Sequence, residues 1–360
     1  QMRKRPMEPI LKILEKLNVK FRFNNKEYHF PFELSSQFTE DEEQKDKIQK
    51  DKIQKDKVQN DKIQKDKIQK MEAEEDRCRN DVEQEENEMS EITIDTNLSS
   101  QFASALLMAA CLLPTGLKIH LTGSRTAGSY IKMTLAMMKQ FGIRVEQTEN
   151  CYEIAHQEGW GLTEYEVEPD VSAACYFYAM TPLLGVPILV PDVHFSSLQG
   201  DVAFLRFLEE MGCSVTDTAS GILALPPENG IYHGIHADMS ACSDQAITLA
   251  ALAPFADSPT TITGIGHIRF QESDRITAIV TELRKMGIQC AETKDSIKIF
   301  PGTPKPSLVD TYEDHRMAMG FSLIGLRSAG IVIDNPGCCK KTFENYFEVL
   351  TEVVRSLSAT

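Results

Sequence analysis

The feature that most constrains the fold is a pattern that occurs four times along the chain. In each copy an amphipathic helix ends at Asn18, Gly142, Gly212 or Gly287, and two short strand-like segments follow. Asn and Gly tolerate a positive φ best, so they are typical of the residue that ends a helix. Gly142 and Gly212 are 70 residues apart, and Gly212 and Gly287 are 75 apart. Because this period is too long for small solenoid modules, it predicts an α/β fold built from compact units of alternating helices and strands.

A low-complexity segment explains why Asn18 and Gly142 are 124 residues apart. Composition changes at about residues 36–89, where the sequence Asp-Lys-Ile-Gln-Lys recurs, with small variations, from Asp46 to Lys70. Five residues turn a helix by about 500°, so the isoleucines of these pentads spiral around the axis instead of forming one apolar stripe. We interpret the segment as a charged, solvated insertion, with a partner-binding arm as the alternative.

The length and charge of the chain limit its class and its partners. At 360 residues, 42% of them hydrophobic, it is long enough for two domains, which we place at 1–170 and 171–360. A net charge of −15 argues against nucleic acid and anionic membrane as broad partners. The sequence has neither a membrane-length apolar run nor a signal peptide, so we expect a cytoplasmic protein. Because the chain starts at Gln1 and soon enters a helix, we also expect it to be part of a longer polypeptide.

The first candidate site is an anion cradle at Ser99, Ser100 and Gln101. These residues follow the predicted strand 92–95 and precede the apolar helix 102–113. A helix N-terminus presents unpaired N–H groups and a positive dipole end, to which hydroxyl and amide donors can be added. The alternative is an ordinary N-terminal cap.

Asp244 is the second candidate, because it is an acid at the start of a small, apolar helix. It could simply cap that helix. Alternatively, a partly buried carboxylate could accept a proton from a substrate hydroxyl, since desolvation raises its basicity.

Charged groups at further helix starts form the third candidate. Glu272 and Arg275 are one turn apart, and His315 and Arg316 open the next apolar helix. An arginine at a helix N-terminus opposes the helix dipole unless an anion binds there, so we expect an anion clamp. Lys341 adds a cation at a later strand-to-helix turn.

No metal or cofactor is expected from the sequence. The nine cysteines include no CxxC pair, and we interpret them as reduced and structural. His233 and His236 have the spacing of two metal ligands but lack a third ligand at a supporting spacing, so we interpret them as a strand or turn pair.

Several segments, in this order, resemble the 5-enolpyruvylshikimate-3-phosphate synthases. That family folds into two domains of three pseudo-symmetric units, and the repeat implies that about four units are present here. The matching segments are Ser99-Ser-Gln-Phe102, Ser129-Tyr-Ile-Lys132, Leu198-Gln-Gly-Asp201, the stretch around Asp244, Glu272-Ser-Asp-Arg275, Asp314-His-Arg-Met317 and Lys341-Thr-Phe343.

The resemblance implies transfer of the enolpyruvyl group of phosphoenolpyruvate to the 5-hydroxyl of shikimate 3-phosphate in aromatic amino-acid biosynthesis. Asp244 would take the hydroxyl proton and contact shikimate 3-phosphate, and Glu272 would transfer a proton at the phosphoenolpyruvate methylene. The remaining implied contacts are Ser99, Ser100, Gln101 and Tyr130 for shikimate 3-phosphate, and Gln101, Arg275, His315, Arg316 and Lys341 for phosphoenolpyruvate.

The partners implied are these two small molecules, and we expect a monomer. The family's N-terminal substrate-gripping segment does not match anything here, and Gln271 stands where the family usually has lysine. Two alternatives therefore stay open. One is an inactive fragment or scaffold, and the other is a UDP-N-acetylglucosamine enolpyruvyl transferase.

Overall fold

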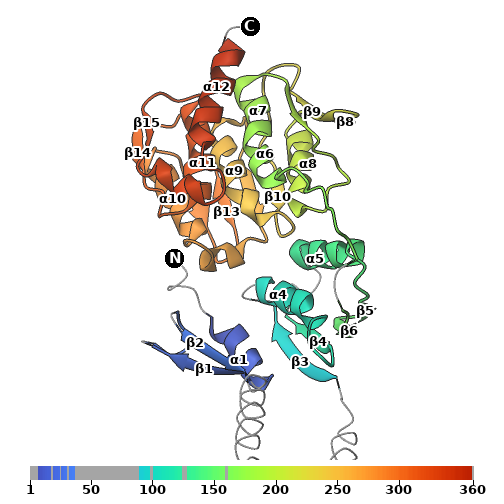
Figure 1. The fold of residues 1–360 in the computed structure, drawn as a ribbon. Coiled ribbons are helices and arrows are strands. Elements are labelled where there is room, and N and C mark those ends of the chain that lie inside the picture. Colours follow the sequence, from blue (N-terminus) through green and yellow to red (C-terminus); the bar gives the residue numbers. More distant parts are fainter. Residues whose placement is uncertain are drawn as a thin grey trace, which may run out of the picture. The chain divides into compact units, whose positions relative to one another are not determined.

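The computed structural model describes residues 7–17, 19–24, 26–30, 32–36, 89–97, 100–123, 128–158 and 161–358. Ser99, Asn18 and the predicted insertion, apart from its two end residues, lie outside these ranges. The chain forms two compact units, which are described separately below (Figure 1). Unit 1 comprises Gln1–Asp95, Ala105–Thr122 and Ile143–Trp160, and unit 2 comprises Thr96–Ser104, Gly123–Gly142 and Gly161–Thr360.

Unit 1 contains an antiparallel strand pair and a four-stranded sheet. The pair is β1 (Val19–Phe23) with β2 (Phe32–Ser36), after helix α1 (Glu8–Lys16). The sheet has the order β3-β4-β6-β5, in which β3 and β4 are parallel and β6 is antiparallel to both of its neighbours. Its strands are β3 (Ser90–Asp95), β4 (Leu117–Thr122), β5 (Glu146–Thr148) and β6 (Cys151–Ile154).

Unit 2 contains a second four-stranded sheet with the same connectivity. Its order is β10-β11-β13-β12, again with a parallel first pair and an antiparallel last pair. The strands are β10 (His236–Asp238), β11 (Thr260–Thr263), β12 (Cys290–Glu292) and β13 (Ile297–Ile299). This shared strand order fits the predicted repeat, while superposition of the units stays a prediction.

The predicted helix stops are confirmed at three positions. Gly142, Gly212 and Gly287 have φ of 80°, 107° and 79°, which favour glycine. Each follows a helix and precedes an antiparallel strand pair. The helices are α5 (Ser129–Gln140), α8 (Phe204–Glu210) and α10 (Arg275–Lys285), and the middle pair is β8 (Ser214–Thr218) with β9 (Gly221–Leu225).

The remaining elements are helices, 3-10 turns and short strands, most of them in unit 2. Helix α6 (Val171–Tyr178) begins at the predicted boundary between the two domains, and Asp170 caps it by accepting from the Ala173 N–H at 3.0 Å. The predicted domain division at this point stays a prediction. Further elements are α4 (Gln101–Ala110), which runs from unit 2 into unit 1, α7 (Met180–Leu184), β7 (Ile188–Pro191), η2 (Gly200–Ala203), η3 (Ser243–Gln245), α9 (Ala246–Leu252), η4 (Ala253–Phe255), η5 (Gly266–Phe270), β14 (Ser307–Val309), α11 (His315–Gly325), β15 (Ile331–Ile333), η6 (Pro336–Lys341) and α12 (Tyr346–Ser358).

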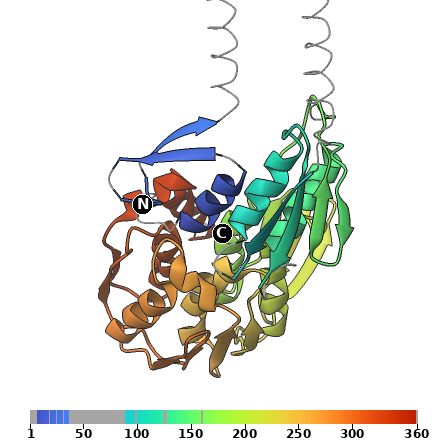
Figure 2. The ribbon, with the colours of Figure 1, turned by 90° about the horizontal axis from the view of Figure 1, so that it is seen from below.

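Helices α9, α10 and α11 pack together and thereby bring their first residues together (Figures 1 and 2). Every residue of α9 is buried, as expected for its entirely small and apolar sequence. Gly320 allows α11 to approach closely, because a Cβ there would lie 2.6 Å from Cγ2 of Ile247. None of the helices in the described ranges has the length and apolar character needed to cross a bilayer.

Candidate active site

The candidate site lies at the starts of three helices of unit 2. Asp244 is in η3, directly before α9, and Arg275 is the first residue of α10. Arg316 is the second residue of α11. Two further acids fix the helix starts: Asp274 accepts from the Thr277 N–H, and Asp314 from the Arg316 N–H, both at 3.0 Å.

Arg275 is the centre of this cluster and is only 1% exposed. Its guanidinium donates five hydrogen bonds, which is its full capacity. They lead to Asp314 (Nε at 2.8 Å, Nη2 at 3.2 Å), Asp244 (Nη1 at 2.9 Å), Glu272 (Nη2 at 3.0 Å) and the side-chain amide oxygen Oε1 of Gln271 (Nη1). Arg275 therefore has no donor left for a substrate in this conformation.

Asp244 is not a helix cap, because its carboxylate is bound by three side chains from other elements. Arg275 holds Oδ1, while Arg316 Nη2 lies 2.8 Å and the Tyr130 hydroxyl 2.9 Å from Oδ2. Burial raises the pKa of Asp244, but the charges of Arg316 and Arg275 outweigh burial and hold the pKa well below its usual value. The sequence interpretation that desolvation makes Asp244 more basic is thus incomplete, since it ignored cations brought in by the fold.

Glu272 has a similar environment at the edge of the cluster. Its Oε1 lies 2.6 Å from Lys341 Nζ, and its Oε2 accepts from Arg275. Burial raises the pKa of Glu272, whereas Arg275 and Lys341 lower it, and the result is about 2. The two carboxylates are therefore ionised near neutral pH and held by cations.

His315 lies beside the cluster as a neutral imidazole at neutral pH. Its Nδ1 is 3.8 Å from Asp314 Oδ1. Burial and the charge of Arg316 lower the pKa of His315 to about 4, although Asp314 opposes them.

The anion expected at the arginine-bearing helix starts is at least partly supplied by the chain itself. Asp244, Glu272 and Asp314 surround Arg275, and Asp244 also pairs with Arg316. The sequence identified the cations correctly as needing negative charge, but it did not show that protein carboxylates provide it.

The predicted residues for shikimate 3-phosphate are placed only in part. Ser100 is buried just before α4, and Gln101 is exposed at its first residue, whereas Ser99 lies outside the described ranges. Tyr130 joins the Asp244 cluster through its hydroxyl. Whether Ser100 and Gln101 face that cluster stays a prediction.

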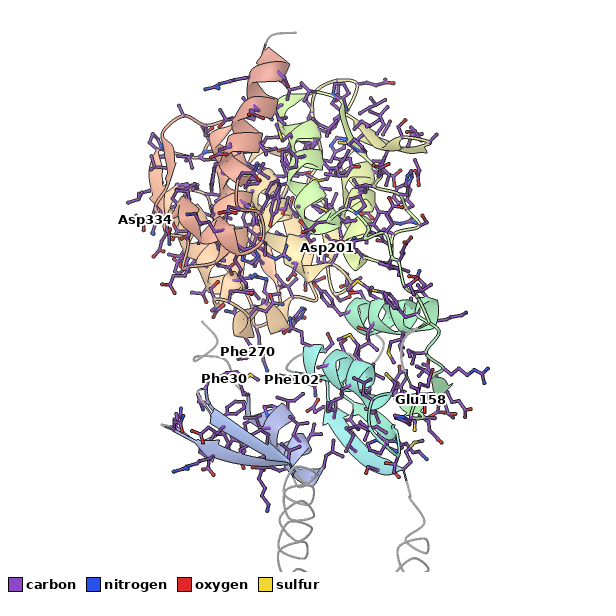
Figure 3. The ribbon with its side chains drawn as sticks, viewed as in Figure 1. Phe30, Phe102, Glu158, Asp201, Phe270 and Asp334 are labelled. Atoms are coloured by element: carbon purple, nitrogen blue, oxygen red, sulfur yellow. The ribbon has the colours of Figure 1, made fainter. Side chains whose placement is uncertain are left out.

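Three buried polar residues near the cluster were not predicted as site residues. Asp201 lies in η2 (Figure 3). It accepts from Gln245 Nε2 at 2.9 Å and from the Ser172 hydroxyl. Burial and the charge of Asp244 raise the pKa of Asp201. Tyr176 is 1% exposed, and its hydroxyl has no hydrogen bond of normal geometry in the described part. The sequence signals for this group were the Leu198–Asp201 segment and the stretch around Asp244, which includes Gln245, because both match the family pattern.

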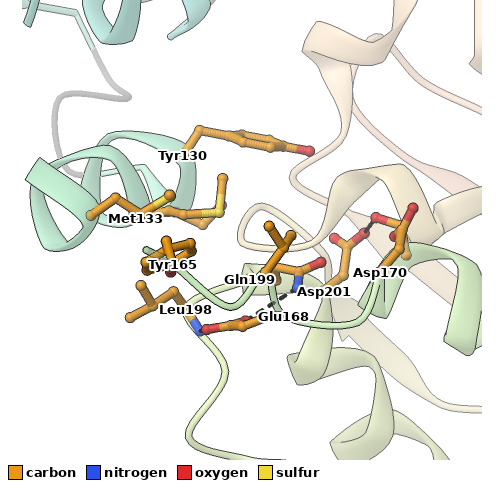
Figure 4. A pocket seen from close by; sticks show the side chains of 13 residues that line it. Tyr130, Met133, Tyr165, Glu168, Asp170, Leu198, Gln199 and Asp201 are labelled. Carbon is orange, nitrogen blue, oxygen red and sulfur yellow. Dashed lines mark hydrogen bonds between the residues drawn. The ribbon is translucent and has the colours of Figure 1, made fainter. Parts of the chain in front are cut away.

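A cavity of about 330 Å³ adjoins the cluster through Tyr130 and Asp201 (Figure 4). Met133, Tyr165 and Leu198 form an apolar wall, and the cavity's charged lining residues are all acidic. Glu168, one of these acids, already accepts from the Ser197 hydroxyl at 2.6 Å and from the Leu198 N–H at 3.2 Å. Without a lining cation, this cavity is poorly suited to a phosphate.

The two histidines at metal-like spacing do not form a metal site in the described ranges. His233 Nδ1 lies 2.6 Å from Asp257 Oδ2. No group of three or more His, Cys, Asp or Glu side chains suitable for a metal ion occurs among the residues described.

Comparison with known proteins gives a family match across most of the chain. The family model for EPSP synthase (3-phosphoshikimate 1-carboxyvinyltransferase) matches residues 67–350. A 3-phosphoshikimate 1-carboxyvinyltransferase of Nostoc punctiforme is 43% identical over 255 residues, which are 71% of this chain and 59% of that protein. A protein of Halalkalibacterium halodurans named 3-phosphoshikimate 1-carboxyvinyltransferase 2 is 40% identical over 265 residues, 73% of this chain and 59% of that protein. The chain thus spans about three fifths of the length of these curated relatives.

Solved structures show the same fold at lower identity. The EPSP synthase of Acinetobacter baumannii matches with a TM-score of 0.67 and 21% identity, over 98% of this chain and 71% of that one. The enolpyruvyl transferase NikO from Streptomyces tendae matches with a TM-score of 0.55 and 18% identity, over 73% of this chain and 63% of that one. These matches agree with the predicted enolpyruvyl transferase type of α/β fold.

Proposed function

Because the chain belongs to the EPSP synthase family, we propose that it acts as a 3-phosphoshikimate 1-carboxyvinyltransferase and carries the proton-transfer groups and an anion clamp of that reaction. The reaction joins the 5-hydroxyl oxygen of shikimate 3-phosphate to C2 of phosphoenolpyruvate and adds a proton to C3. Loss of phosphate from C2 and of a proton from C3 then restores the double bond. The products are 5-enolpyruvylshikimate 3-phosphate and phosphate.

The observation that carries this proposal is the joining of Asp244, Glu272, Arg316 and Lys341, from four separate segments, into one network. The reaction requires a group that accepts the hydroxyl proton, a group that exchanges a proton at C3, and cations that hold phosphate and carboxylate. In our proposal Asp244 and Glu272 supply the first two. Arg316 and Lys341 hold phosphoenolpyruvate, with His315 beside them.

Arg275 has a different role in this proposal from the one that the family resemblance implies. All five of its donors are bound by protein groups. We therefore assign Arg275 as a positioning residue that holds Asp244 through Nη1 and Glu272 through Nη2. Direct binding of phosphoenolpyruvate by Arg275 would require it to give up a carboxylate.

Shikimate 3-phosphate is assigned in this proposal to the start of α4 and to Tyr130. Ser99, Ser100 and Gln101 would place hydroxyl and amide donors beside the helix N-terminus, where a phosphate is favoured. Tyr130 would contact the same substrate while its hydroxyl donates to Asp244.

The proposal is tested by incubating the purified chain with both substrates and following release of inorganic phosphate and formation of the enolpyruvyl product. We expect both to appear in equal amounts, and neither when one substrate is omitted. A chain that binds the substrates without turnover would support the inactive-fragment alternative. Product formation with UDP-N-acetylglucosamine as the acceptor would support the other transferase.

A further inference from the structure

Each cation that we assign to phosphoenolpyruvate is already paired with a carboxylate that we assign to proton transfer. Arg316 Nη2 lies 2.8 Å from Asp244 Oδ2, and Lys341 Nζ lies 2.6 Å from Glu272 Oε1. An anion that binds these cations must therefore compete with the protein's own carboxylates.

We propose that an oxyanion bound at Arg316 and Lys341 displaces Asp244 and Glu272 from them, so that the anionic substrate itself releases the two carboxylates for proton transfer. This inference rests on the proposed function and adds to it a control of when the bases act. Before the anion binds, the site neutralises itself. After it binds, the carboxylates lose a cation each and become better proton acceptors.

Arg275 explains why the released carboxylates stay in position. Its Nη1 binds Asp244 and its Nη2 binds Glu272, on atoms other than those that Arg316 and Lys341 use. Asp244 exchanges at Oδ2 and keeps Oδ1 on Arg275, and Glu272 exchanges at Oε1 and keeps Oε2. Loss of the outer partner thus changes the charge around each carboxylate without removing its anchor.

The Arg316–Asp244 and Lys341–Glu272 pairs differ in how easily the cation can leave its carboxylate for a bound anion. The Lys341 side chain is 41% exposed, and a lysine ammonium on its flexible stem can turn toward a ligand. The Arg316 side chain is 13% exposed and is also influenced by Asp201 and Tyr176. We expect exchange to begin at the Lys341–Glu272 pair.

The effect on proton transfer follows from the charges facing each acid. Asp244 is surrounded by Arg275, Arg316, the Tyr130 hydroxyl and the more distant Asp201. When Arg316 turns to the bound anion, Arg275 is the one cation of this set that still faces Asp244, while the negative charge of Asp201 remains nearby. The pKa of Asp244 therefore rises. A carboxylate with a higher pKa is a stronger general base at neutral pH.

Glu272 is surrounded by Arg275, Lys341 and, at longer range, Asp314. When Lys341 turns to an anion, the pKa of Glu272 rises from about 2 toward the ordinary value of 4.5. The exchange therefore affects both bases in the same direction.

The test measures binding of sulfate by calorimetry at neutral pH, because sulfate neither reacts nor titrates there. We expect Glu272→Gln to bind sulfate about tenfold more tightly than the unaltered chain, since a competing charge-assisted hydrogen bond is gone. The matched control is Glu292→Gln, which makes the same charge change at an acid paired with Arg269. It should leave sulfate affinity almost unchanged, and Lys341→Met should weaken it.

Weaker or unchanged sulfate binding by Glu272→Gln would overturn the exchange, as would absence of sulfate binding in both proteins. Melting temperatures of all variants show whether an altered affinity reflects unfolding. The measurement needs no turnover, so an inactive chain that shows the expected affinities would contradict the proposed function and leave the anion exchange intact.

Discussion

Nε of Arg275 lies 2.8 Å from Oδ2 of Asp314, and both side chains are almost completely buried. Asp314 also caps α11 by accepting from the Arg316 N–H. The pair therefore joins the starts of α10 and α11 and fixes the positions from which Glu272 and Arg316 extend.

Removing Asp314 should be strongly destabilising. We expect Asp314→Ala to lower the free energy of unfolding by about 3–5 kcal/mol, because it leaves a buried guanidinium without its main partner. Glu292→Ala, which breaks the more exposed pair with Arg269, should cost at most about 1 kcal/mol. Urea unfolding of both variants measures the difference. Equal losses of unfolding free energy would show that the buried Arg275–Asp314 pair stabilises the fold no more than the more exposed Arg269–Glu292 pair does.

Close packing of α9 and α11 predicts opposite effects at two glycines of one helix. Gly320→Ala places a Cβ 2.6 Å from Ile247 Cγ2 and should destabilise by about 1–3 kcal/mol. At Gly325 the nearest atom would be 3.6 Å away, so Gly325→Ala should be neutral or stabilise by up to about 1 kcal/mol. Thermal unfolding compares them, and a harmless Gly320→Ala would argue against the close helix approach.

The free energy of unfolding should decrease as the pH is lowered, partly through His315. Its folded pKa of about 4 lies below the usual value of 6.5, so the unfolded chain binds more protons as pH falls below neutral. Between pH 7 and 5.5 this group should cost about 1 kcal/mol of unfolding free energy, a loss that His315→Gln should remove. Denaturant unfolding at both pH values tests this, and an unchanged pH slope in the variant would place the titration elsewhere.

Arg316→Ala should weaken binding of phosphoenolpyruvate about tenfold or more. In our proposal Arg316 makes a charge-assisted contact with the bound substrate, and this contact contributes to binding as well as to the reaction. Arg327→Ala makes the same substitution at a side chain that lies over the Phe255 ring, and it should leave binding nearly unchanged. Titration with phosphoenolpyruvate measures both. Equal weakening would indicate a general charge effect.

The local features of this fold were readable from sequence, because they depend on neighbouring residues. The stops at Gly142, Gly212 and Gly287 follow from backbone sterics, and the apolar run of α9 predicts its burial. The pairing of Asp244 with Arg275 and Arg316 was not readable, since it depends on how three helices pack. For the same reason the sequence did not show the carboxylates that hold Arg275, or the cations that lower the pKa of Asp244.

The most direct test of the central claim is the turnover and phosphoenolpyruvate affinity of Asp244→Asn in a chain that carries out the reaction. If Asp244 accepts the substrate proton while pairing with Arg316, kcat should fall about 10²–10⁴-fold. Phosphoenolpyruvate should bind at least as tightly as before, because the substitution removes a competitor of the anion and no cation. A kcat close to that of the unaltered chain, or a loss of binding as large as that of Arg316→Ala, would contradict the account.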